Sequence, residues 1–208
     1  MPAAPPAAAL TASDLVVRRG GRTVLDGLSA TFPAGAVTAL TGPNGSGKST
    51  LLDALAGVLD PSAGRVTGLP ADGVAYVTQA VPPTVLPLTV RATVAMGRWR
   101  RRPWWRPPGR DDRRIVDAQL ERMAIGGLAD RPLEGLSGGQ RQRTLVALGL
   151  AQGSRVVLVD EPTAGVDRDS AALVVAALAA EAARGVVVVH AAHDAAAIAA
   201  ADRVVTLA

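Results

Sequence analysis

Cysteine is absent from the 208 residues, and aromatic residues make up only 2% of them. The first absence excludes disulfides and thiolate metal sites, and nothing in the composition points to an oxidising compartment. The second means that a core must be built from Ala, Val, Leu and Ile, since hydrophobic residues still account for 49% of the chain. A chain of this length and composition is long enough for one packed domain.

Long apolar runs are also missing. The nearest candidate for a membrane span, residues 173–189, is interrupted by Glu181, Arg184 and Gly185, and it is shorter than the roughly 20 apolar residues that a membrane helix needs. The N-terminal segment MPAAPPAAAL lacks a basic region and contains prolines, so residues 1–12 are expected to form a disordered tail rather than a signal peptide. Any membrane role would therefore require a partner protein.

Positive charge is carried almost entirely by arginine. Of 22 basic residues, Lys48 is the single lysine, which indicates a position that needs a compact ammonium rather than a planar guanidinium. Residues 98–114 hold eight Arg and two Asp, a net charge of +6, whereas the whole chain carries +4. The basic character is therefore one local patch, and no nucleic-acid partner is expected.

Short apolar runs alternate with segments of helical periodicity along the chain. Strands are expected at residues 15–17, 23–25, 36–40, 73–78, 156–159, 186–189 and 204–207, and helices at residues 49–59, 90–96, 115–123, 137–151, 169–183 and 195–201. This alternation predicts an α/β fold with a mostly parallel sheet that is covered on both faces.

A glycine-rich loop separates one of these strands from the helix that follows it. Its sequence fits the phosphate-binding pattern G-x-x-x-x-G-K-[ST] and consists of Gly42, Pro43, Asn44, Gly45, Ser46, Gly47, Lys48, Ser49 and Thr50. Glycines let backbone N–H groups turn towards phosphate oxygens, and the helix N-terminus adds a favourable dipole. Lys48 would reach the β- and γ-phosphates, and the Ser49 hydroxyl would bind Mg²⁺. A chance glycine turn explains the strand–loop–helix context less well.

Two carboxylates follow the fully apolar strand at residues 156–159. At the carboxyl edge of a parallel sheet they would face a ligand, with Asp160 holding Mg²⁺ and Glu161 acting as a general base on the attacking water. Acidic residues also end many strands without any chemistry. This pair alone leaves both interpretations open.

A third segment, LSGGQ at residues 136–140, opens a predicted helix. Taken alone it can be a Ser N-cap followed by permissive glycines. Its five residues also match the signature motif of ABC ATPases. With GPNGSGKST, Gln79, VVLVDEP at residues 156–162 and His193-Asp194 in the usual order and spacing, the chain resembles that family over essentially its whole length.

The resemblance implies a P-loop NTPase (RecA-like) core with a small antiparallel β subdomain and an inserted α-helical subdomain. Residues 13–208 would form one ATP-binding domain, with the helical subdomain at about residues 82–150. Two copies of the chain would sandwich ATP, and the nucleotide held by one copy would be contacted by the signature residues of the other, namely Ser137, Gly138, Gly139 and Gln140.

The family pattern also assigns roles to three single residues. Gln79 would be the glutamine that senses Mg²⁺ and the membrane subunit, although a polar residue at a strand end is an ordinary feature. His193 would be the histidine that contacts the γ-phosphate, whereas His190 is expected to be a strand residue without chemistry. Asp167 would lie across the dimer interface, and it also suits a helix N-cap.

The implied ligands are ATP and Mg²⁺, and the implied partners are membrane-spanning permease subunits, with an extracytoplasmic substrate-binding protein as an indirect partner. The chain would then act at the cytoplasmic face of the membrane. LPLTVRATVAMGRWRR and LSGGQRQRTLVALGLAQ are similar to ATPases of zinc and manganese importers, with siderophore importers as the alternative. Soluble ABC ATPases usually carry two cassettes or a long coiled coil, and a P-loop kinase would leave LSGGQ unexplained.

Two regions depart from the family pattern or lie outside it. ABC ATPases usually carry an aromatic residue before the first hairpin turn, where it stacks on adenine, whereas this chain has Arg18 and Arg19. Because a guanidinium plane can stack on a base, Arg19 is predicted to replace that aromatic residue. The Arg- and Trp-rich residues 98–110 form either a solvated loop or a contact with anionic lipid headgroups, with nucleic-acid binding as a third alternative.

Overall fold

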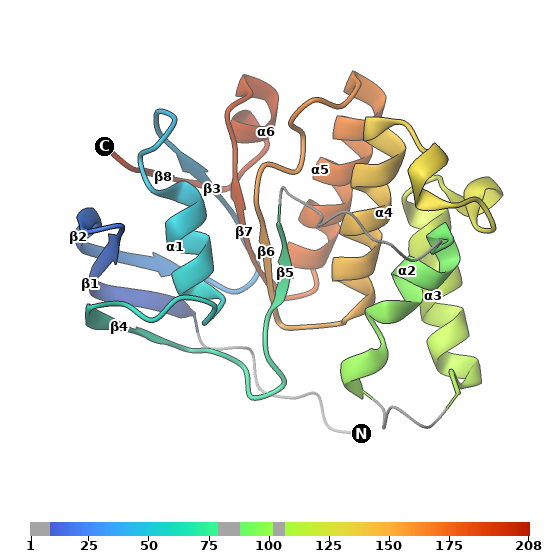
Figure 1. The fold of residues 1–208 in the computed structure, drawn as a ribbon, viewed down its shortest axis with the longest axis horizontal. Helices are drawn as coiled ribbons and strands as arrows, with labels where there is room; N and C mark the ends of the chain where they lie inside the picture. Colours follow the sequence, from blue (N-terminus) through green and yellow to red (C-terminus); the bar gives the residue numbers. More distant parts are fainter. Residues whose placement is uncertain (1–8, 79–87, 102–106) are drawn as a thin grey trace.

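The computed structural model describes residues 9–78, 88–101 and 107–208, which form two sheets surrounded by helices (Figure 1). The larger sheet has the strand order β5-β6-β7-β3-β8 and the smaller one β2-β1-β4. The larger sheet contains β3 (Val37–Thr41), β5 (Ala75–Val77), β6 (Val156–Val159), β7 (Val187–Ala191) and β8 (Arg203–Thr206); the smaller contains β1 (Leu10–Arg19), β2 (Arg22–Phe32) and β4 (Ala63–Thr67). The larger sheet is parallel and the smaller antiparallel, which confirms the predicted fold class.

Helices cover both faces of the parallel sheet (Figure 1). Helix α1 (Lys48–Leu55) lies between the two sheets, whereas α4 (Gly138–Ala151) and α5 (Arg168–Ala182) lie on the opposite face. Beyond α4, the helices α2 (Val90–Met96) and α3 (Arg110–Arg122) form the helical subdomain. The remaining elements are α6 (Ala195–Ala199) and three 3-10 helices, η1 (Trp99–Arg101), η2 (Gly126–Leu128) and η3 (Leu133–Gly135).

The core is divided by the parallel sheet into two hydrophobic clusters. Val157, Val159 and Val188 point into the cluster beneath α4 and α5, while their neighbours Leu158 and Val189 point towards α1 and the smaller sheet. This alternation follows from the two-residue repeat of a strand. Because both faces are covered, β6 and β7 are apolar almost throughout, as expected for buried parallel strands.

The first strand starts earlier than predicted. A disordered tail was expected over residues 1–12, but β1 begins at Leu10, which is fully buried and pairs with Phe32 in β2. Residues 10–12 therefore belong to the sheet, because the alternating apolar side chains of Leu10 and Ala12 find cover that composition alone does not reveal. The tail prediction for residues 1–8 lies outside the described residues.

Two other elements show where local pattern was insufficient. Strand β4 was not predicted, because its residues are mostly exposed and its existence depends on pairing with β1. Helix α3 was predicted from residue 115 but begins at Arg110, where the Gly109 N–H donates to the Asp112 carboxylate at 3.1 Å and closes the first turn. Within the described ranges, no helix has the length and apolar character needed to cross a bilayer.

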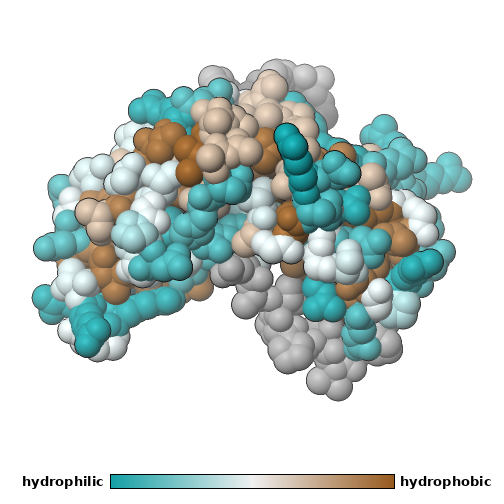
Figure 2. Space-filling model, turned by 90° about the horizontal axis from the view of Figure 1, so that it is seen from above, coloured by the Kyte–Doolittle hydropathy of each residue, from teal (hydrophilic) through white to brown (hydrophobic). Residues whose placement is uncertain are grey.

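Within the described part of the chain, few large hydrophobic side chains remain exposed. They are Val58, Leu69, Trp99 and Val204. Figure 2 shows hydrophobic residues lying among hydrophilic ones on the face seen from above. Single exposed apolar residues are ordinary on protein surfaces.

Candidate nucleotide-binding site

The glycine-rich loop joins β3 to α1, and its shape depends on glycine. Gly42, Gly45 and Gly47 have φ angles of 143°, 86° and 94°, which other residues rarely adopt. A Cβ on Gly42 would lie 2.4 Å from the carbonyl oxygen of Leu207, and one on Gly47 would lie 2.8 Å from a methyl group of Leu25. Backbone conformation and close packing therefore both require glycine in this loop.

Lys48 is the first residue of α1, and its side chain folds back over the loop. Its Nζ donates to the carbonyl oxygens of Gly42 at 2.9 Å and Pro43 at 3.0 Å, and the residue is only 5% exposed. Because Gly47 occupies the N-cap, no side chain caps α1. A buried ammonium beside a helix N-terminus without a side-chain cap is suited to bind phosphate.

Asp160 follows β6 directly and faces the start of α1. Burial, the largest effect, raises the pKa of Asp160 above its ordinary value, although the nearby Ser49 hydroxyl and Lys48 lower it. Asp160 Oδ1 is buried and has no hydrogen-bond partner among the described residues. A hydroxyl beside a buried carboxylate oxygen is a donor set that fits Mg²⁺, whose charge would offset the desolvation.

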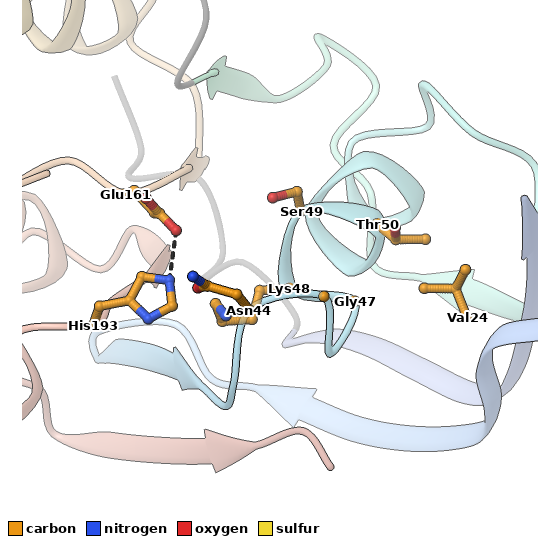
Figure 3. Close-up of a pocket in the computed structure, with 9 residues that line it drawn as sticks. Val24, Asn44, Gly47, Lys48, Ser49, Thr50, Glu161 and His193 are labelled. Atoms are coloured by element: carbon orange, nitrogen blue, oxygen red, sulfur yellow. Dashed lines mark hydrogen bonds and ion pairs between the residues drawn. The ribbon is translucent and has the colours of Figure 1, made fainter.

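Glu161 and His193 come from different loops and meet directly. His193 Nε2 and Glu161 Oε1 are 2.6 Å apart. Glu161 has φ of 48°, a left-handed conformation that costs a glutamate on the order of 1 kcal/mol or more. Such strain is commonly found at functional sites. The side chain is aimed at His193 from the carboxyl edge of the sheet (Figure 3).

A second pair, which sequence analysis did not predict, ties the same two loops together. The Thr163 hydroxyl donates to the Asp194 carboxylate, whose other oxygen caps α6 through the N–H of Ala197. Although partial burial raises it, these hydrogen bonds lower the pKa of Asp194 overall. Thr163 lies two residues after Glu161 and Asp194 directly after His193, so this pair joins the two loops beside the Glu161–His193 contact.

Lys48, Glu161 and His193 line one cleft of about 660 Å³, whereas Asp160 is not among its lining residues (Figure 3). The glycine loop and α1 supply one side, and Glu161 and His193 the other; the lining residues are Val24, Asn44, Gly45, Gly47, Lys48, Ser49, Thr50, Glu161 and His193. The structure thus brings together segments that are far apart in sequence. Val24 was not predicted, because a strand valine carries no functional signal until the fold places β2 beside Gly47.

The signature segment lies outside this cleft, at the N-terminus of α4. Ser137 Oγ accepts the N–H of Gln140 at 3.3 Å, and Gln140 Oε1 accepts the N–H of Ser137 at 3.1 Å, which forms a reciprocal capping box. The N-cap alternative for Ser137 is therefore confirmed. The residues that line the cleft include neither Ser137 nor Asp167.

Comparison with known proteins identifies the family. The family model described as "ABC transporter" matches residues 25–164, a range that contains the glycine loop, the signature segment and both carboxylates. The chain belongs to the ABC transporter family. It is an ABC ATPase, a P-loop NTPase that binds ATP and serves as the ATP-binding subunit of an ABC transporter.

Individual relatives resemble this ABC ATPase over much of its length. The hemin import ATP-binding protein of Rhodococcus jostii is 40% identical, over 97% of this chain and 72% of the relative. The zinc import ATP-binding protein of Cereibacter sphaeroides is also 40% identical, over 76% of this chain and 61% of the relative. Among solved structures, an inward-facing ABC transporter described as of metal-chelate type matches with a TM-score of 0.85 and 29% identity, over 96% of this chain and 79% of that one.

Three further predicted residues can be followed in the ABC ATPase. Asp167 caps α5, accepting the Ser170 N–H at 2.8 Å, so its N-cap alternative is confirmed. His190 lies buried in β7, away from the cleft lining, and burial lowers its pKa and favours the neutral ring. Gln79 lies outside the described residues, and its role stays a prediction.

Arg19 lies at the end of β1, and its guanidinium is tied to α1. Its Nη2 donates to Asp53 Oδ2 at 2.7 Å, while the Tyr76 hydroxyl donates to Asp53 Oδ1 at 2.9 Å. Burial, the largest effect, raises the pKa of Tyr76, and the adjacent Asp53 raises it further. Arg19 does not appear among the cleft-lining residues. Its stacking on adenine stays a prediction. The structure adds that the guanidinium which would stack is hydrogen-bonded to the Asp53 carboxylate.

The first arginine of the basic residues 98–114 is mostly buried. Arg98 donates to the Asp112 carboxylate at 3.0 Å and to the Ala151 carbonyl oxygen at 2.7 Å, and its side chain is 12% exposed. Trp99 is 55% exposed, while residues 102–106 lie outside the described residues. Headgroup contact stays a prediction, and Arg98 is not available for it.

Proposed function

We propose that this ABC ATPase hydrolyses ATP between two copies of the chain to drive import of a metal ion or metal chelate. The observation that carries the proposal is the cleft that joins Lys48, Ser49, Glu161 and His193. Phosphate-binding, cation-binding and water-activating groups lie together there. That combination serves phosphoryl transfer rather than nucleotide storage.

The glycine loop and Lys48 bind the phosphates in this scheme. The uncapped N-terminus of α1 contributes its N–H groups and dipole, and Lys48 exchanges its bonds to the Gly42 and Pro43 carbonyls for bonds to the β- and γ-phosphates. Because these two carbonyl oxygens already hold Nζ over the loop, the Lys48 side chain needs to move little to reach a bound phosphate. Val24 supplies an apolar contact at the rim of the cleft.

Ser49 and Asp160 are the residues that would hold Mg²⁺. The buried Oδ1 of Asp160 and the Ser49 hydroxyl supply hard oxygen donors. When bound, Mg²⁺ would neutralise negative charge on the β- and γ-phosphate oxygens. Gln79 is proposed to complete this arrangement and to report it to the permease.

Glu161 is the proposed general base, and His193 positions it. The contact between Glu161 Oε1 and His193 Nε2 orients the carboxylate that would accept a proton from the attacking water. Once ATP is bound, the Nε2 proton of His193 could instead be donated to the γ-phosphate, the contact that the family resemblance implies. The strained backbone of Glu161 helps to fix the direction of the carboxylate.

The second copy supplies the other wall of the site. We propose that its Ser137, Gly138, Gly139 and Gln140 close over the γ-phosphate and that Asp167 lies at the interface between copies. This placement accounts for residues that lie at the N-termini of α4 and α5 but outside the cleft of their own copy.

Hemin is the first cargo to test, since the hemin relative aligns over 97% of this chain. Zinc or manganese is the second, because the zinc relative has the same identity but aligns over 76%. The ATPase would act with permease subunits at the cytoplasmic face of the membrane, fed indirectly by an extracytoplasmic binding protein, and without nucleic acid.

Cells that lack the gene provide the test. Uptake of labelled hemin and labelled zinc would be measured after complementation with the wild-type chain or with Glu161→Gln. Loss of hemin uptake, restored by the wild type alone, supports the first cargo, whereas the same pattern for zinc alone supports the second. Normal uptake of both in the deletion strain would contradict the proposed class of cargo.

A further inference from the structure

The N-terminus of α5 carries an Asp–Ser pair that is more tightly bonded than a helix cap requires. Asp167 Oδ1 accepts the Ser170 N–H at 2.8 Å, and Asp167 Oδ2 accepts the Ser170 hydroxyl at 2.7 Å. Ser170 is 3% exposed although Asp167 lies at the surface. The two hydrogen bonds, the backbone one first, lower the pKa of Asp167. Asp167 is therefore an oriented carboxylate at neutral pH.

Other helices show that the Ser170 hydroxyl is not needed for capping. Thr89 caps α2 through the N–H of Ala92, and Asp194 caps α6 through the N–H of Ala197. In both helices the third residue after the cap is alanine, so the backbone N–H suffices. In α5 the same position is Ser170, which takes the second oxygen of the cap as well.

The pair also forms the surface on which α4 packs. A Cβ on Gly139 would lie 2.7 Å from both Asp167 Oδ2 and Ser170 Oγ, and 3.2 Å from Ser170 Cβ. One on Gly138 would lie 3.6 Å from the Gly165 carbonyl oxygen. The backbone of the signature segment therefore rests directly on the Asp167–Ser170 pair of its own chain.

We propose that Ser170 is a positioning residue for the site formed by two copies of the chain. By holding Asp167 and supporting Gly139, it sets where the signature segment presents its Ser137 hydroxyl and helix N-terminus to the other copy's nucleotide. The inference rests on the proposed two-copy function. It adds a residue that belongs neither to the glycine loop nor to the signature segment. Ser170 itself is buried and is not among the residues that line the nucleotide cleft.

Ser170→Ala is the direct test, because it keeps the capping N–H and removes only the hydroxyl. Nucleotide affinity of the single copy should stay within about twofold, since the cleft of that copy is untouched. The kcat should fall on the order of tenfold, the effect of one lost hydrogen bond to a charged group. In a Glu161→Gln background, the ATP-dependent dimer measured by light scattering should weaken by a similar factor.

Two further variants separate positioning from general stability. Ser154→Ala removes another buried serine hydroxyl, which donates to the Gly73 carbonyl oxygen at 2.6 Å, and it should leave kcat unchanged at a comparable melting temperature. Ser170→Thr keeps the hydroxyl and should restore kcat. The proposal is overturned if Ser170→Ala matches Ser154→Ala in kcat and dimer formation, or if Ser170→Thr fails to restore the loss. If Glu161→Gln alone forms no ATP-dependent dimer, the two-copy function itself is wrong.

Discussion

Two helix N-termini of this ATPase contain glycine, and they use it for opposite purposes. At the start of α1, Gly42, Gly45 and Gly47 all have positive φ, and no side chain caps the helix. At the start of α4, Gly138 and Gly139 are part of the helix and Ser137 caps it through a reciprocal box. The first N-terminus is thus left for an anion, whereas the second is partly satisfied within the chain.

This difference indicates how labour is divided between the two ends of the molecule. The α1 end gathers Lys48, Glu161 and His193 into one cleft within a single copy. The α4 end supplies no residue to the lining of that cleft, and its Gly139 is needed for close packing on α5. Variants at the α1 end should therefore alter events within one copy, and variants at the α4 end should alter events between copies.

The largest effect is expected for Lys48. Lys48→Ala should weaken ATP binding by at least about 100-fold, because charge-assisted bonds to two phosphates are lost from a buried site. Isothermal titration of the single copy measures this. Lys48→Arg should also bind poorly, because a planar guanidinium does not replace the ammonium between the Gly42 and Pro43 carbonyls. Full affinity in Lys48→Arg would contradict the need for a compact charge.

The second largest effect is expected for Glu161→Gln, which should slow hydrolysis rather than weaken ATP binding. Phosphate release should fall by about 10²- to 10⁴-fold, the usual contribution of a general base, while ATP binding is retained. A dimer should accumulate with ATP, as seen by size-exclusion chromatography. Rapid turnover in this variant would remove Glu161 from its role.

Ser137→Ala tests the α4 end. Turnover should fall about tenfold through a lost contact with the other copy's nucleotide, and stability should fall by about 1 kcal/mol through loss of the cap. Affinity of the single copy for ATP should not change. If affinity and turnover fell together by the same factor, the proposed division between the two ends would not hold.

Arg19→Ala should give the smallest effect, at the rim of the α1 end. If the guanidinium held by Asp53 stacks on the base, nucleotide affinity should fall about fivefold or less, as for an exposed cation–π contact. Arg65→Ala, an exposed arginine of β4 in the same sheet, is the matched control. Equal affinities of both variants would remove Arg19 from base binding.

Much of the α1 end could be predicted because its signals are local. The buried strand β6 was predicted with its observed bounds, and α1 was predicted within one residue of its start. Those signals are apolar runs and glycine spacing, which act over a few residues. By contrast, β4 and the first residues of β1 depend on distant pairing partners, such as Thr11 with Thr67, and no local pattern reports such pairing.

The sequence by itself determined the family motifs, the parallel α/β arrangement and the place of the single lysine, Lys48, in the glycine loop. These follow from periodicity, from backbone permissiveness and from the chemistry of single residues. Only the tertiary structure decided that Glu161 meets His193, that Arg19 is held by Asp53, and that Gly139 rests on Asp167 and Ser170. Each of these contacts joins segments distant in the chain, so its existence depends on how helices and strands pack rather than on local preference.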